Sequence, residues 1–197
     1  YGLIMGKSVN AFLAKAGSLI VELKERADVS PYIVSELTAL FREVKEAMEK
    51  IKELETNIES IAKTLKHYDL FQSALGVGPI TAATMLVLLC NPAVFKNGRE
   101  FAAYIGLAPK SSGSGGKNFV THIPKKCECN NDVRALLVQC AHSICRCKHK
   151  SDWVSSILAR KPKKVAIIAI ANKLARQLWI MAKKGEKFEK RFILAAV

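Results

Sequence analysis

Residues 31–65 read PYIVSELTALFREVKEAMEKIKELETNIESIAKTL, and this stretch decides the fold class. Apolar residues recur along it in steps of four and three, with no glycine or proline after Pro31. This spacing places them on one stripe of a long helix, which is the heptad pattern of a coiled coil. The stripe consists of Ile33, Leu37, Leu40, Val44, Ala47, Ile51, Leu54, Ile58, Ile61 and Leu65.

Two pairings would cover this stripe. The β-branched residues Val44, Ile51 and Ile58 favour a two-stranded coil with another copy of the chain. The alternative is a hairpin within the chain, because residues 7–26 also have the periodicity of an amphipathic helix. Ser30 and Pro31, a helix-capping residue and a proline suited to the first helical position, mark where the long helix begins.

Beyond Tyr68 the sequence predicts shorter helices. Gly76-Val77-Gly78-Pro79 separates helices expected over 56–74 and 79–90, and a glycine-serine loop lies within the polar stretch 109–131, where 118–123 favours a short strand. Further helices are expected over 99–105, 131–147, 152–160 and 163–184. The fold class is therefore mainly α: a long coiled-coil-like helical hairpin, then a compact helical domain with a helix-hairpin-helix segment and a Gly/Ser active-site loop.

Charge divides the sequence into two parts. The chain has a formal net charge of +14, from 31 Lys and Arg against 17 Asp and Glu. Residues 1–69 hold 10 basic and 11 acidic side chains, whereas residues 70–197 hold 21 basic and 6 acidic ones. A cationic domain suits a polyanionic partner, and nucleic acid is the simplest one. We expect a helical connector and dimerisation segment over 1–69 and a DNA-handling domain over 70–197.

Other classes of protein fit less well. The longest uninterrupted apolar run, 165–171, has 7 residues, whereas about 20 are needed to span a bilayer. The first residues lack the features of a signal peptide, so the six cysteines are expected to be reduced thiols. We expect a cytoplasmic protein without a membrane partner. Because the chain opens on Tyr1 rather than Met, we also expect a fragment of a longer protein.

The turn after Leu75 is a candidate phosphate contact. Gly76 and Gly78 allow a tight turn that exposes backbone N–H groups at the start of the next helix, where Thr81 follows. Such contacts hold the DNA backbone without reading its sequence. The alternative is a plain turn between two core helices.

The glycine-serine loop also has two interpretations. Its glycines flank Ser112 and Ser114, and Lys117 could neutralise a phosphate, so the loop is a candidate for a serine nucleophile. The alternative is a linker. A Walker-type phosphate loop is excluded, because Asn118 follows Lys117 where that motif needs Ser or Thr.

A metal site has little support in the sequence. The cysteines form two pairs, Cys127 with Cys129 and Cys145 with Cys147, each separated by one residue, whereas zinc sites prefer two to four. The acids of 70–197 show no convergent set of the kind that a two-metal nuclease needs. In the last helix, Asn172, Lys173 and Arg176 have spacings that place them on one side, as either a phosphate-binding stripe or a solvated face.

Five segments, in consistent order, resemble the C-terminal half of one insertion-sequence transposase family, which includes the bridge-RNA-guided recombinases and the Piv-type DNA invertases. The resemblance covers roughly residues 70–190. The segments are LGVGPITAA at 75–83, FKNGREFAAYIGLAP at 95–109, SGGK at 114–117, RALL at 134–137 and ANKLAR at 171–176. The sequence departs from the family at Cys127-Glu128-Cys129, where a basic-glycine turn is usual.

The resemblance carries expectations about chemistry. Members of this family pair an N-terminal RuvC-like domain, which carries four metal-binding acids, with a C-terminal domain that carries a nucleophilic serine. Ser114 takes the nucleophile position, Ser112 is the second candidate, and Lys117 and Arg134 are expected to stabilise the phosphate. Mg²⁺ is expected in the RuvC-like domain and no cofactor in this chain, so the isolated chain is expected to be inactive.

The same resemblance implies DNA as a partner, a guide RNA as a further one, and a place at the bacterial nucleoid. An alternative function from another class is a DNA-binding and oligomerisation module without a catalytic role. It would use the turn at Gly76 and Gly78 for phosphate contact and the heptad helix for pairing of identical chains. The two functions differ at Ser114, whose loss would spare binding but not recombination.

Overall fold

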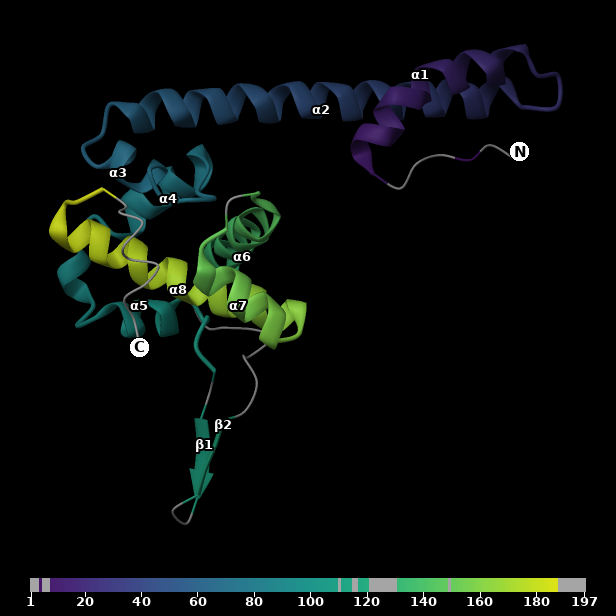
Figure 1. Cartoon of the computed structure of the whole chain (residues 1–197). Coiled ribbons are helices and arrows are strands. Elements are labelled where there is room, and N and C mark those ends of the chain that lie inside the picture. The colour runs from purple at the N-terminus through teal and green to yellow at the C-terminus, as the bar shows by residue number, and fades with distance from the viewer. Residues whose placement is uncertain are drawn as a thin grey trace. The chain divides into compact units, whose positions relative to one another are not determined.

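The computed structural model describes residues 4, 8–109, 111–114, 117–120, 131–148 and 150–187. The chain is mainly α, as predicted. It divides into two compact units, Tyr1–Asn57 and Ile58–Val197, which are coloured from purple to blue and from blue to yellow in Figure 1. The boundary between the two units falls within the long helix α2 (Pro31–Lys63), which continues across residue 57. The predicted domain division between residues 69 and 70 stays a prediction.

The first unit is built from α1 (Val9–Glu25) and the first part of α2. Ser8 caps α1 by accepting a hydrogen bond from the Ala11 backbone N–H at 3.2 Å. The rings of Phe12 and Phe41 meet edge to face, with centroids 6.2 Å apart. A small buried cluster joins the two helices and consists of Ile20, Leu23, Val29 and Val34. Residues 9–25 therefore pack against the beginning of α2.

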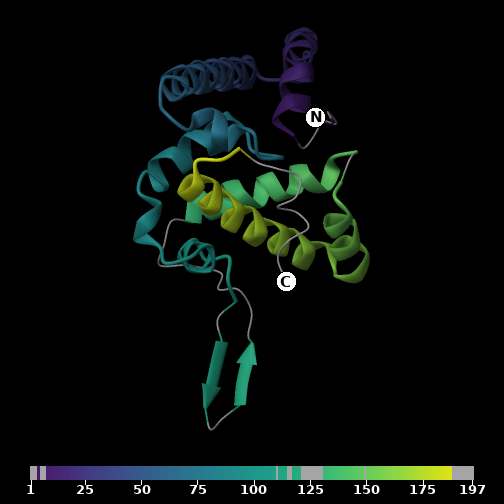
Figure 2. The same ribbon diagram turned by 60° about the vertical axis from the view of Figure 1, so that its left-hand side comes forward.

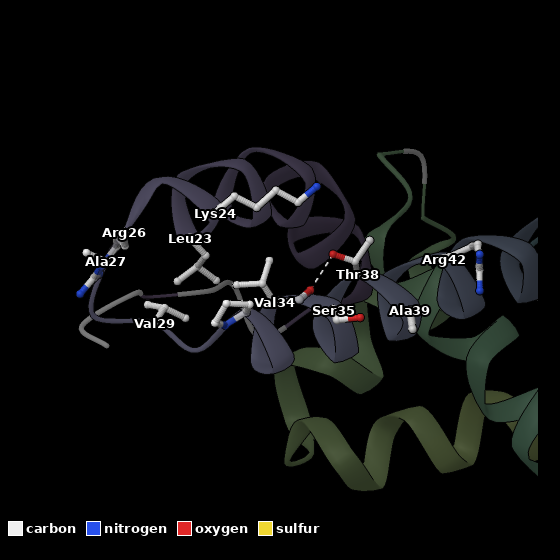
Figure 3. Close-up of a pocket in the computed structure, with 11 residues that line it drawn as sticks. Leu23, Lys24, Arg26, Ala27, Val29, Val34, Ser35, Thr38, Ala39 and Arg42 are labelled. Carbon is white, nitrogen blue, oxygen red and sulfur yellow. Dashed lines mark hydrogen bonds between the residues drawn. The ribbon is translucent and has the colours of Figure 1, made fainter.

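A hollow of about 710 Å³ opens beside this cluster (Figure 3). Leu23 and Val34 line it, and the Thr38 hydroxyl donates a hydrogen bond to the Val34 carbonyl at 2.7 Å. None of the site residues predicted from the sequence lines this hollow. All of the predicted site residues belong to the second unit.

The rest of the apolar stripe on α2 is exposed. Ile51, Leu54 and Ile61 are 50%, 48% and 64% exposed. The buried cluster that holds α1 to α2 reaches only as far as Phe41 along α2. Of the heptad stripe only Ile33 packs against this cluster, whereas Leu37 and Leu40 are 39% and 53% exposed. Pairing of the stripe with another copy stays a prediction.

The second unit surrounds one central helix. It contains α3 (Tyr68–Gln72), α4 (Pro79–Leu88), η1 (Pro92–Val94), α5 (Gly98–Tyr104), α6 (Asn131–Arg146), α7 (Asp152–Arg160) and α8 (Lys163–Lys184). Helix α8 contacts α3, α5, α6, α7 and η1, and Figures 1 and 2 both show α6 beside it. Its buried residues are Ala166, Ile167, Ile170, Ala171, Leu174, Ala175, Gln177, Leu178, Trp179 and Met181.

Local capping explains where these helices begin and end. Asn97 accepts a hydrogen bond from the Glu100 N–H at 3.0 Å at the start of α5, and Ser151 accepts one from the Val154 N–H at 3.3 Å at the start of α7. Gly185 ends α8 in the left-handed conformation, with φ 71°. The helices expected from 99, 131, 152 and 163 onward accordingly agree with the structure to within a residue at each end.

Two expectations need correction. The helix expected over 56–74 is broken: α2 ends at Lys63, His67 has a left-handed backbone with φ 76°, and α3 begins at Tyr68. Burial explains the break, because the turn lets Tyr68 and Phe71, each 1% exposed, enter the core.

The stretch expected as a glycine-serine loop instead contains an antiparallel hairpin, β1 (Ser111–Ser114) with β2 (Lys117–Val120). Figure 2 shows its two strands side by side. The strand expected over 118–123 is present as far as Val120, and residues 121–123 lie outside the described residues.

Candidate active site

The hairpin brings the predicted nucleophile and its predicted phosphate-stabilising lysine to neighbouring positions. In the strand register, Ser114 pairs with Lys117 and Ser112 pairs with Phe119. The connecting residues, Gly115 and Gly116, have a sequence favoured in two-residue hairpin loops. Directly opposed residues of antiparallel strands are close neighbours in space, so the backbone places positions 114 and 117 together.

The chain leaves α5 for this hairpin through a left-handed glycine. Gly106 has φ 77°, its N–H bonds the Ala103 carbonyl at 2.9 Å, and the Leu107 N–H bonds the Ala102 carbonyl at 2.9 Å. This pair of bonds is the Schellman arrangement, which satisfies carbonyls left open at a helix end. Leu107 is 1% exposed, so the start of the path toward β1 is buried in the core.

Packing accounts for Gly76 and Thr81, two of the predicted phosphate contacts. Gly76 has φ 80°, and a Cβ atom there would lie 2.7 Å from Ile144 Cγ1 and 2.8 Å from the Cys140 carbonyl oxygen. Thr81 is 5% exposed, and its hydroxyl oxygen accepts a hydrogen bond from Cys140 Sγ at 3.5 Å. The turn therefore needs both residues for its close approach to α6.

Gly78 differs from its neighbour. It caps α4 in an extended conformation, with φ −92°, and a Cβ atom there would meet nothing within 4 Å. Pro79 has no N–H, so the N–H groups of Ile80 and Thr81 are the first that this helix offers. Within the predicted turn, Gly78 therefore has free space beside it, whereas Gly76 is packed against α6.

The cysteines of α6 have the properties of core residues. Cys140 is buried, and burial raises the pKa of its thiol above the ordinary value, against the opposing hydrogen bond with Thr81. Burial also raises the pKa of the Cys145 thiol. Among the described residues no group of three or more His, Cys, Asp or Glu side chains is placed to hold a metal ion. Cys127 and Cys129, one of the two pairs considered for zinc, lie outside the described residues.

The residues predicted as one stripe on α8 face two different neighbours. Asn172 Nδ2 donates a hydrogen bond to the Leu107 carbonyl at 3.1 Å. The Lys173 ammonium lies 4.1 Å from the centroid of the Trp153 ring of α7. Burial, and then the charge of Arg176, lower the pKa of Lys173. Lys173 and Arg176 are thus close enough for their charges to interact. Asn172 instead bonds the segment that leads from α5 to the hairpin.

Arg134 lies in the first turns of α6 at a partly buried position.

Trp153 was not singled out from the sequence, because nothing local shows that it contacts Lys173. Leu107 belongs to a segment that the sequence singled out only through the family resemblance.

Helix α8 also resembles a membrane span in length and composition. Among the described residues it is the one helix that is long and apolar enough, and 56% of its apolar window is buried within the chain. Its place at the centre of the second unit accounts for this composition, because a core helix surrounded by other helices is apolar on most sides.

The second unit thus combines a surplus of basic residues, a serine-bearing hairpin and a glycine turn packed against its core. Comparison with known proteins specifies the class. Residues 68–154 match the family described as Transposase IS116/IS110/IS902 family. This part of the chain is therefore similar to the transposase domain that the family description names. The match begins at the first residue of α3 and includes the glycine turn, the hairpin and α6.

Relatives from several bacteria extend the comparison. The chain is 35% identical over 185 residues to a Sinorhizobium fredii protein that carries the name transposase y4pF/y4sB, covering 89% of this chain and 47% of the relative. It is 31% identical to the transposase for insertion sequence element IS1328 of Yersinia enterocolitica, covering 87% and 52%. It is 28% identical to the transposase for insertion sequence element IS1111A of Coxiella burnetii, covering 95% and 52%. The chain therefore spans about half the length of the curated relatives it matches.

Proposed function

We propose that this chain is the part of a transposase that binds DNA and supplies a serine nucleophile for phosphodiester exchange. The observation that carries the proposal is the position of the hairpin: its serines lie inside the region that matches the transposase family. The surplus of basic residues over 70–197 supports DNA as the substrate. Ser114 is the proposed nucleophile, and Ser112 is the second candidate.

The proposed step balances as an exchange of esters. The Ser114 hydroxyl oxygen attacks a DNA phosphorus, a phosphoserine ester forms, and one P–O bond of the DNA backbone breaks. The serine gives up its proton, and the departing DNA oxygen takes one up. Attack by another DNA hydroxyl on the phosphoserine reverses the step and rejoins the strand, so no external energy source is needed. Lys117, opposite Ser114, and Arg134 would neutralise charge that develops on the phosphate oxygens.

The proposed reaction also involves a divalent metal ion, which would be bound by another part of the full-length protein. The family resemblance implies a RuvC-like domain that binds Mg²⁺ through its acids, and this chain spans about half of its relatives. We propose that the metal-binding acids lie in the part of the full-length protein outside this chain. A guide RNA as a further partner, and a place at the bacterial nucleoid, rest on the same resemblance.

The test uses the full-length protein, its DNA substrate and Mg²⁺. A denaturing gel detects DNA joined covalently to protein, and mass spectrometry identifies the serine that carries the phosphate. Ser114→Ala is expected to abolish the covalent product, whereas Ser111→Ala, in the same strand, is the matched control and is expected to retain it. If Ser112→Ala abolishes the product and Ser114→Ala does not, the nucleophile is Ser112.

The second candidate function is a DNA-binding and oligomerisation module without catalysis. The exposed stripe of α2, which contains Ile51, Leu54 and Ile61, favours pairing with a second copy of the chain. The two functions separate in one experiment. A protein that binds DNA and pairs, but never forms a covalent serine product in the full-length context, is the module and not the recombinase.

A further inference from the structure

Helix α8 holds the segment 92–107 at three successive points. Trp179 Nε1 donates a hydrogen bond to the Pro92 carbonyl at 3.0 Å. The Arg176 backbone packs against Gly98, where an added Cβ atom would lie 3.1 Å from the Arg176 carbonyl oxygen. Asn172 Nδ2 donates to the Leu107 carbonyl at 3.1 Å. The residue numbers of these contacts fall along α8 as they rise along the segment 92–107, so the helix and the segment are antiparallel.

The last of these three contacts lies at the start of the path to the hairpin. Leu107 is followed by three residues, 108–110, before β1 begins at Ser111. One of them is Pro109, whose ring fixes its φ angle and stiffens the connection. Leu107 therefore lies four positions before the first residue of the hairpin, with a conformationally restricted proline between them.

The Leu107 carbonyl needs the Asn172 amide. Leu107 is 1% exposed, so its carbonyl oxygen lies where water has little access. A buried carbonyl without a donor is unfavourable, and a chain that loses its donor tends to move until the oxygen meets another one or water. The Schellman bonds at Gly106 fix the N–H side of this turn, and Asn172 fixes its carbonyl side.

We propose that Asn172 is a positioning residue for the nucleophile hairpin, acting through the Leu107 carbonyl rather than touching DNA. This inference rests on the proposed function, because it presumes that the hairpin carries the reacting serine. A misplacement of about 1 Å far from the chemistry can cost about 100-fold in rate. Loss of the amide donor is therefore expected to slow covalent phosphoserine formation by about 10- to 100-fold.

The experiment replaces Asn172 in the full-length protein by Leu, which is similar in size but has no donor. Asn172→Asp is the second variant if Asn172→Leu does not fold, because a carboxylate keeps the size and polarity but cannot donate. Trp179→Phe is the matched control: it removes another hydrogen bond from α8 to the same segment, at the end remote from the hairpin. Melting temperature, DNA affinity and the rate of covalent product formation at saturating DNA are measured for each.

Positioning predicts a selective effect. The covalent rate of the Asn172 variant falls about 10- to 100-fold, its DNA affinity stays within about threefold, and Trp179→Phe loses stability without a comparable loss of rate. Amide hydrogen exchange at Leu107 and Ala108 is faster in the Asn172 variant than in the wild type. A covalent rate within twofold of wild type, or a loss no greater than that of Trp179→Phe, overturns the proposal.

Failure of the proposed function has a different signature. In that case Ser114→Ala and Ser112→Ala leave the reaction of the full-length protein unchanged. Amide exchange at Leu107 needs no activity and still reports whether Asn172 holds this segment in place. Unchanged exchange at Leu107 in the Asn172 variants overturns the positioning role whatever the serines do.

Discussion

The Lys173 ammonium lies 4.1 Å from the centre of the Trp153 ring, so a lysine predicted to bind phosphate forms a cation–π contact with a tryptophan of the neighbouring helix α7. A cation over an aromatic face is attracted by the ring quadrupole, whose face is partially negative, typically by about 0.5–1 kcal/mol at exposed sites. The contact joins α7 to α8 and partly buries the lysine.

Lys173 should make stability depend on pH in the alkaline range. Burial, followed by repulsion from Arg176, lowers the pKa of Lys173 from the ordinary value of 10.5. Between the lowered pKa and 10.5 the unfolded chain binds more protons than the folded one, so stability rises with pH there. The wild type should therefore gain stability relative to Lys173→Met in that range, as measured by urea unfolding. Lys164→Met, at an exposed position of α8, is the control for the removal of a lysine from this helix.

Gly76 and Gly78 should respond differently to the same substitution. Gly76→Ala combines a left-handed backbone with contacts of 2.7 and 2.8 Å to α6, and we expect a loss of about 2–4 kcal/mol in the free energy of unfolding. Gly78→Ala meets open space and should cost only about 0.5–1 kcal/mol, because alanine is a poorer N-cap than glycine. Equal losses at the two positions would contradict the packing of the turn against α6.

The thiols should differ in reactivity. Burial raises the pKa of Cys140, and its residue is 5% exposed, whereas Cys90 is exposed. Because the thiolate is the reactive form, Cys140 should resist alkylation in the folded protein while Cys90 reacts. Mass spectrometry after brief treatment with iodoacetamide identifies the labelled residues, and denaturation should make both react. Early labelling of Cys140 would show that α6 opens readily from the core.

The exposed stripe of α2 should control self-association. Ile51→Glu together with Leu54→Glu places two charges on this stripe, and burial of such charges in a paired coil is unfavourable. We expect the doubly substituted protein to sediment as a smaller species than the wild type. Lys52→Glu introduces the same side chain beside the stripe and serves as the control. A wild-type protein that is monomeric at high concentration would refute pairing through α2.

Arg176 should contribute to DNA binding through charge alone. Arg176→Gln keeps the backbone and Cβ that pack against Gly98 but removes the cation. If Arg176 neutralises one phosphate, the slope of log affinity against log salt concentration should decrease in magnitude by about 1. Lys24→Gln, in the first unit, should leave the slope unchanged. An unchanged slope in Arg176→Gln would remove this residue from the DNA interface.

Much of the fold was predictable because the signals are local. Ser151, Asn97 and Gly185 set helix ends through bonds to residues within four positions, and these ends agree with the prediction. The break at His67 was not predictable, because its left-handed backbone serves the burial of Tyr68 and Phe71 in a core assembled from distant segments. Tertiary packing decided the conformation against the local pattern.

The site shows the same division. The sequence identified the turn at Gly76, but its close approach to α6 depends on Cys140 and Ile144, more than 60 residues away. The spacing of Asn172 and Arg176 correctly places both residues on one side of a helix. It cannot show that the Leu107 carbonyl lies within hydrogen-bond distance of Asn172. The pairing of Ser114 with Lys117 follows from two short strands in a stretch whose composition is typical of a loop.

The central place of α8 has a consequence for synthesis on the ribosome. α8 is the last of the described helices to emerge, yet α3, α5, α6 and α7 all pack on it. Domains generally fold as units, and this one has no complete core until residues 163–184 are available. A nascent or prematurely terminated chain would thus lack both its core and the Asn172 tether.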